Sequence, residues 1–121
     1  MTSGANVAAI LKVERIAETL RWYRSVGFEV RGVFPDEDPT WAEVARDGLV
    51  LQFLAGDTPW DGPPSLTGCL YVHPSSVQRV YDQIRESVPC EWGIEDRPWG
   101  ARELTVQDPN GYFVTFTEDA V

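Results

Sequence analysis

Residues 97–118, RPWGARELTVQDPNGYFVTFTE, form the stretch that decides the fold. β-Branched, aromatic and aliphatic residues on both sides of its centre predict two strands, at 101–107 and 112–118. The centre, Asp108-Pro109-Asn110-Gly111, has the composition of a tight turn, because proline restricts one backbone angle and glycine accepts the left-handed region. The stretch therefore predicts a β-hairpin.

The first half of the chain predicts a similar hairpin around Asp47-Gly48, a dipeptide that strongly favours a two-residue turn. A helix precedes it, in which Ile16 and Leu20 follow helical spacing and Gly27 supplies the stop. The predicted elements are a strand at 7–13, a helix beginning near Glu14, and strands at 28–34, 40–46 and 49–54.

The second half predicts the same order of elements. Ser75 and Ser76 are suitable N-cap residues for a second helix, in which Val77 and Val80 belong to the apolar stripe. The remaining predicted elements are a linker at 56–68, strands at 69–72 and 90–94, and a loop at 96–100.

The two halves form an internal repeat. Ile16 and Val77 lie 61 positions apart, and Gly48 and Gly111 lie 63 apart. This repeat predicts an α+β fold of two βαβββ modules, whose curved mixed sheets each have one face covered by a helix and one concave face left open. The predicted organisation is a single domain of residues 1–121, with module one at 5–55, a linker at 56–67 and module two at 68–118.

Composition excludes several function classes. The chain has 121 residues, 43% of them hydrophobic, and its 19 acidic against 10 basic residues give a net charge of −9. Nucleic acid is therefore not an expected partner, because phosphate binding needs clustered lysine and arginine. No apolar run is long enough to span a membrane and no signal peptide is recognisable, so we expect a cytoplasmic protein with free thiols at Cys69 and Cys90.

Several motifs resemble one known family. Trp22-Tyr23 followed by Gly27-Phe28, and Trp99-Gly100-Ala101-Arg102-Glu103 followed by Asp108-Pro109-Asn110-Gly111, are similar to segments of the vicinal oxygen chelate superfamily. That superfamily includes glyoxalase I, extradiol dioxygenases, fosfomycin-resistance enzymes and bleomycin-resistance proteins, and the second motif most resembles the bleomycin-resistance branch. The resemblance implies a homodimer whose subunits complete each other's grooves, with or without exchange of the first strand.

The resemblance also implies where metal ligands would lie in the metal-dependent members. Those positions correspond here to Ala8, Gln52, Cys69 and Thr115. Alanine has no donor atom and threonine is a poor ligand for a catalytic divalent ion, so two usable ligands remain. His73 shares the strand parity of Cys69 but lies nearer the strand end. We therefore expect no metal, no other cofactor and no catalytic residues.

Aromatic residues and carboxylates are the candidate ligand contacts. Trp60 and Trp99 lie in loops, where they either stack on a planar ligand or cap the end of a sheet. Phe34 and Trp41 flank the acidic loop 36–38, which either attracts a flat cation or is simply a solvated turn. Glu103 could act as a base or cation acceptor, or it could form an ion pair with Arg102.

Strand parity separates the two faces of the predicted sheets. Gln52, Cys69 and Thr115 would share the open face with Val50, Tyr71 and Phe113. The residues predicted to face the helices are almost wholly apolar: Leu49, Leu51, Phe53, Leu70, Val72, Val114 and Phe116. A mixed open face of this kind suits a ligand cavity, which needs apolar walls and few polar groups.

The function predicted from the sequence is non-catalytic sequestration of a small aromatic compound, neutral or cationic, such as a bleomycin-type antibiotic. The alternatives are a metal-dependent lyase, isomerase or dioxygenase of the same superfamily, and a binding module for another small molecule. The predicted ligand-binding residues are Phe34, Asp36, Trp41, Gln52, Trp60, Tyr71, Trp99, Glu103, Phe113 and Thr115.

Overall fold

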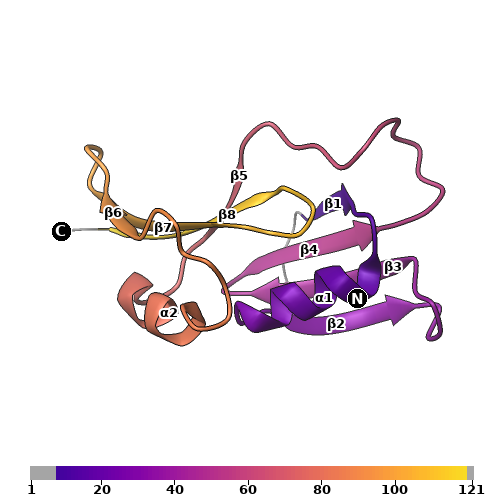
Figure 1. Ribbon diagram of the computed structural model, residues 1–121, viewed down its shortest axis with the longest axis horizontal. Coiled ribbons are helices and arrows are strands. Elements are labelled where there is room, and N and C mark those ends of the chain that lie inside the picture. The colour runs from indigo at the N-terminus through magenta and orange to yellow at the C-terminus, as the bar shows by residue number, and fades with distance from the viewer. Residues whose placement is uncertain (1–7, 120–121) are drawn as a thin grey trace.

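A computed structural model describes residues 8–119, and within them it contains two helices and eight strands (Figure 1). The first module consists of β1 (Ala9–Lys12), α1 (Ile16–Ser25), β2 (Glu29–Phe34), β3 (Trp41–Arg46) and β4 (Leu49–Leu54). The second consists of β5 (Cys69–Val72), α2 (Val77–Ile84), β6 (Ile94–Asp96), β7 (Ala101–Gln107) and β8 (Phe113–Asp119). The α+β fold of two βαβββ modules is thus confirmed.

The two sheets share one topology. Their strand orders are β1-β4-β3-β2 and β5-β8-β7-β6, so each module contributes one complete four-stranded sheet. In each sheet the first strand runs parallel to the last, and the other neighbours are antiparallel. This equivalence confirms the internal repeat. Because β1 pairs with β4 of its own chain, strand exchange is not needed to complete the first sheet.

One predicted strand is largely wrong. The expected strand at 90–94 is instead a turn followed by β6, which begins at Ile94. The amide of Gly93 donates to the carbonyl of Cys90 at 3.1 Å, and Gly93 has a φ of +60° that interrupts an extended strand. Pairing of β6 with β7 therefore begins after this turn, at Ile94 opposite Leu104.

The hydrophobic core lies on the helix-covered side of both sheets and joins the two modules. Of the residues predicted to face the helices, Leu51, Phe53, Val72, Val114 and Phe116 are completely buried, and Leu49 and Leu70 are partly buried. The predicted parity of β4, β5 and β8 is therefore confirmed. Neither helix of the described residues 8–119 covers the opposite faces of the two sheets, and a candidate site has to be sought there.

A second connection between the modules is polar. The turn between β7 and β8 packs beside β1 and α1, as Figure 1 shows. Tyr23 donates a buried hydrogen bond of 2.7 Å to Asp108, and the Tyr112 hydroxyl donates to the Lys12 carbonyl. The Asn110 side chain accepts from the Glu14 amide at 3.0 Å. The Asp108-Pro109-Asn110-Gly111 turn thus holds α1 against the second sheet.

Two smaller expectations concern the cysteines and the membrane. Cys69 and Cys90 are free, as predicted. Neither helix in residues 8–119 has the length and apolar character needed to cross a bilayer. The predicted strand at 7–13 includes Val7, which lies outside the described residues.

Candidate functional site

The open face of the second sheet contains a shallow pocket of about 310 Å³. Strands β5, β7 and β8 form its floor, and the loop between β6 and β7 forms one wall. It is lined by Cys69, Tyr71, Arg97, Trp99, Glu103, Thr105, Phe113 and Thr115. Half of the residues predicted from the sequence as ligand contacts are therefore brought together here.

Glu103 is the electrostatic centre of this pocket. Its side chain is almost fully buried and accepts hydrogen bonds from Tyr71 (2.6 Å), Arg97 (3.1 Å) and Thr117 (3.2 Å). Burial opposes ionisation of the carboxyl, but the three hydrogen bonds and the Arg97 charge outweigh it and hold its pKa below the ordinary value. The hydrogen bond that Tyr71 donates to Glu103 also raises the pKa of the Tyr71 hydroxyl.

A pH prediction follows from the lowered pKa of Glu103. A carboxyl with a depressed folded-state pKa stabilises the fold fully above its unfolded pKa, and this contribution is lost as pH falls through the folded pKa. As the pH falls through the folded-state pKa of Glu103, we expect the free energy of unfolding to decrease less in Glu103→Gln than in the wild type. The expected difference between the two decreases is on the order of 1 kcal/mol. Urea denaturation at a series of acidic pH values measures this difference.

The matched control for this prediction is Glu86→Gln, which removes an equal charge from a side chain that is 87% exposed. The control should keep the wild-type dependence on pH. If Glu103→Gln and the wild type lose stability in parallel on acidification, the hydrogen bonds to Glu103 do not favour its charged form.

Glu103 forms an ion pair with Arg97 and not with Arg102, the partner that the sequence offered as one alternative. Arg102 is its sequence neighbour, but adjacent residues of a strand point to opposite faces, and Arg102 pairs with Asp96 at 3.0 Å instead. The Arg97 amide donates to the Ala101 carbonyl at 2.7 Å, and this hydrogen bond closes the loop between β6 and β7. The closed loop places the Arg97 side chain on the open face, where it pairs with Glu103. The short loop between 96 and 101 was the only sequence signal for this contact.

Aromatic rings surround the Glu103 network. Trp99 is 67% exposed and lies with its ring centroid 5.9 Å from the Arg97 guanidinium carbon. Tyr71 is 42% exposed, and Phe113 is partly buried against Trp92, with ring centroids 5.9 Å apart. Large aromatic side chains left open to solvent are costly unless something covers them, so this pocket is suited to a planar, partly apolar group.

The open face of the first sheet carries a second polar network. The Trp41 indole donates to the Gln52 side-chain oxygen at 3.2 Å, and the Gln52 amide nitrogen donates to Glu43 at 2.9 Å. Phe34, paired with Trp41 across β2 and β3, is 69% exposed. Sequence reasoning missed Glu43, although it has the same strand parity as Trp41 and lies opposite Gln52.

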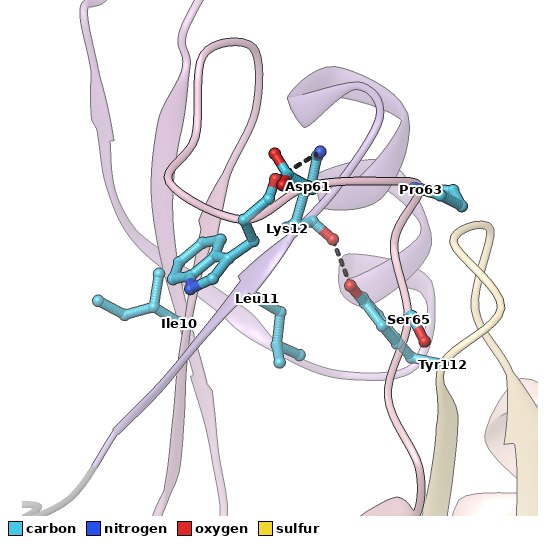
Figure 2. A pocket seen from close by; sticks show the side chains of 8 residues that line it. Ile10, Leu11, Lys12, Asp61, Pro63, Ser65 and Tyr112 are labelled. Atoms are coloured by element: carbon cyan, nitrogen blue, oxygen red, sulfur yellow. Dashed lines mark hydrogen bonds between the residues drawn. The ribbon is translucent and has the colours of Figure 1, made fainter.

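Trp60 lines a different pocket, of about 240 Å³, between β1 and the linker (Figure 2). The Lys12 ammonium donates to the carbonyls of Trp60 (3.1 Å) and Gly62 (2.5 Å) and so holds the linker against β1. Asp36 lies in an exposed loop and makes no hydrogen bond or ion pair with residues 8–119. The structure therefore does not bring Trp60 or Asp36 to the pocket around Glu103.

The residues at the family's ligand positions do not suit a divalent metal. Ala8 has no donor atom, and the Thr115 hydroxyl shares a hydrogen bond of 2.9 Å with Thr105. Within the part of the chain that the structure describes, no three His, Cys, Asp or Glu side chains are grouped closely enough to hold a metal. Two of the four positions, Ala8 and Thr115, therefore lack a side chain suited to a catalytic divalent ion.

Comparison with known proteins gives one family. The model of the Glyoxalase/Bleomycin resistance protein/Dioxygenase superfamily matches residues 6–116. No curated protein sequence matches the chain.

Among solved structures, TioX from Micromonospora sp. ML1 has a TM-score of 0.78 at 21% identity, covering 96% of this chain and 99% of that one. A bleomycin-binding protein complexed with bleomycin has a TM-score of 0.71 at 20% identity, covering 94% and 98%. A glyoxalase/bleomycin resistance protein from Catenulispora acidiphila DSM 44928 has a TM-score of 0.66 at 25% identity, covering 95% and 98%.

Proposed function

This chain belongs to the Glyoxalase/Bleomycin resistance protein/Dioxygenase superfamily, and from that premise we propose that it binds and sequesters a small aromatic compound without altering it chemically. The observation that carries the proposal is the pocket on the second sheet, where Tyr71, Trp99 and Phe113 surround the hydrogen-bonded Glu103. Apolar walls with a few fixed polar groups are the usual composition of a small-molecule site.

The state of Glu103 supports binding rather than proton transfer. A general base needs a free lone pair and a pKa near the working pH. Glu103 already accepts from three donors, which occupy three of its roughly four acceptor sites, and its pKa is held below the ordinary value. In the proposed role, the carboxylate fixes the positions of Tyr71 and Arg97, which then present a hydroxyl and a guanidinium to the ligand.

The compound we propose first is a bleomycin-type antibiotic, since a structure of similar fold is a bleomycin-binding protein in complex with bleomycin. Titration with copper-free and copper-loaded bleomycin, followed by tryptophan fluorescence, tests it, because Trp99 and Trp92 lie at or beside the pocket. Saturable quenching at micromolar ligand is the expected result. An absence of quenching would refute the antibiotic, and a stoichiometric metal in the purified protein would refute the non-catalytic role.

The proposal includes a homodimer in which the first sheet of one subunit faces the second sheet of its partner. Both open faces leave large apolar side chains in water: Phe34 and Ile10 on the first, Trp99 and Tyr71 on the second. A second copy would cover both faces at once and turn two shallow surfaces into a groove. A cytoplasmic location and a contribution to antibiotic resistance belong to the same proposal.

The dimer gives a separate prediction. We expect the wild type to sediment at about twice its chain mass of 13.6 kDa, and Phe34→Asp to weaken self-association by roughly tenfold or more, because a charge would be buried in an apolar interface. Sedimentation velocity over a concentration series measures both. Ser87→Asp, which adds the same charge at an exposed position after α2, should leave association unchanged. A monomeric wild type would refute the dimer.

A further inference from the structure

We propose that Glu43 is the specificity-determining residue of this ligand site, and that it selects aromatic compounds carrying a positively charged nitrogen. The inference rests on the proposed function and on its dimer, in which the first sheet of one subunit, where Glu43 lies, faces the pocket on the second sheet of its partner. It is carried by the placement of Glu43, by the network that holds it, and by the lack of a counter-charge beside it.

Glu43 lies in the middle of the open face of the first sheet. Its neighbours across the strands are Gly32 on β2 and Gln52 on β4. Gly32 has no side chain, and the Trp41 ring lies over it, so close that an added Cβ would be 3.3 Å from the ring. An aromatic surface therefore lies directly beside the carboxylate, an arrangement suited to a flat cation.

The hydrogen bonds hold Glu43 in one orientation. The Trp41 indole can only donate, so the Gln52 oxygen faces Trp41 and the Gln52 amide nitrogen faces Glu43. One carboxylate oxygen of Glu43 takes this bond, and the other makes none with residues 8–119. Since every fully buried side-chain oxygen in the described part has a partner, this second oxygen remains accessible to a ligand group.

Glu43 also lacks a counter-charge. It is only 4% exposed, yet none of the ion pairs in residues 8–119 includes it. Residues 1–7 contain no lysine, arginine or histidine. Burial of a carboxylate without an opposite charge is unfavourable, and a cationic ligand would supply the missing charge.

The second sheet provides the contrast. Glu103 is equally buried, but it has a cation of the same chain beside it: Arg97 lies 3.1 Å from Glu103 and 3.3 Å from Glu95. The pocket around Glu103 therefore offers stacking and hydrogen bonds beside a carboxylate that already has a cationic partner. Glu43 is the buried carboxylate of the open faces that lacks such a partner among residues 8–119, so we assign the preference for a cation to it, and the two open faces recognise different parts of a ligand.

The test uses a matched pair of probes, the cation N-methyl-4-phenylpyridinium and the similarly shaped neutral 4-phenylpyridine, titrated by calorimetry at alkaline pH. We expect the wild type to bind the cation on the order of tenfold more tightly than the neutral probe. Glu43→Gln should remove that preference and change the affinity for the neutral probe by about twofold or less. Glu43→Asp, which keeps the charge, should keep part of the preference.

The controls separate the possible failures. Glu86→Gln removes one negative charge from a distant, exposed position and should keep the wild-type preference. Thermal unfolding should show Glu43→Gln at least as stable as the wild type, because an amide needs no counter-charge. Equal binding of both probes to the wild type, or a preference that survives in Glu43→Gln, overturns the role of Glu43 but not the binding function. Failure of both probes to bind overturns the two together.

Discussion

Asp108→Ala is expected to lower the free energy of unfolding by about 3–4 kcal/mol, the largest effect among these substitutions. The Asp108 carboxylate accepts from the buried Tyr23 hydroxyl at 2.7 Å and from the amides of Asn110 (2.8 Å) and Tyr112 (2.9 Å). Alanine would leave all three donors without an acceptor, two of them in buried surroundings. The bond to Tyr23 also spans the two modules, so its loss loosens the contact between α1 and the second sheet.

Equilibrium urea denaturation measures this effect, with Asp108→Asn as the matched control. Burial raises the pKa of Asp108 despite the hydrogen bonds from Tyr23, Tyr112 and Asn110 that lower it, so the charged carboxylate is itself held at a cost. Asparagine keeps an acceptor for the two amides and removes that cost, and we expect it to lose no more than about 1 kcal/mol. Equal losses in the two variants would mean that the carboxylate charge, and not hydrogen-bond acceptance, stabilises the turn.

Trp99→Ala is expected to weaken binding of copper-free bleomycin by roughly 1–3 kcal/mol, the scale of a lost aromatic anchor. One face of the Trp99 ring is approached by Arg97, and 67% of the residue is open to solvent, so the other face is free to stack on a planar group. Removing the ring also frees the Arg97 guanidinium that it helps to orient. Calorimetry measures the affinity independently of the tryptophan signal.

Trp60→Ala is the matched comparison for Trp99→Ala. Trp60 is also an exposed loop tryptophan, but it lines the pocket between β1 and the linker and not the pocket around Glu103. We expect its substitution to change the affinity by about threefold or less. An unchanged affinity in Trp99→Ala would assign that residue a structural role, and a larger loss in Trp60→Ala would place the ligand at the linker.

Much of the fold was predictable because it depends on local patterns. Strand and helix periodicity indicated every element except the exact position of β6. There a turn at Gly93 makes the strand begin at Ile94, later in the sequence than expected. Parity correctly assigned Phe53 and Val114 to the core, since alternation within a strand needs no knowledge of its neighbours. The site was partly predictable for the same reason: Tyr71, Phe113 and Thr115 share one face through parity and register.

The sequence alone determined the order of elements, the repeat and the face on which each strand residue lies, because these follow from short-range spacing. The tertiary structure alone decided which charges meet. It paired Glu103 with Arg97 rather than with Arg102, and among residues 8–119 it left Glu43 bound to Gln52 without a cation. It also separated Trp60 from Trp99. Such contacts depend on strand register, loop closure and packing between distant segments, and local spacing carries no information about them.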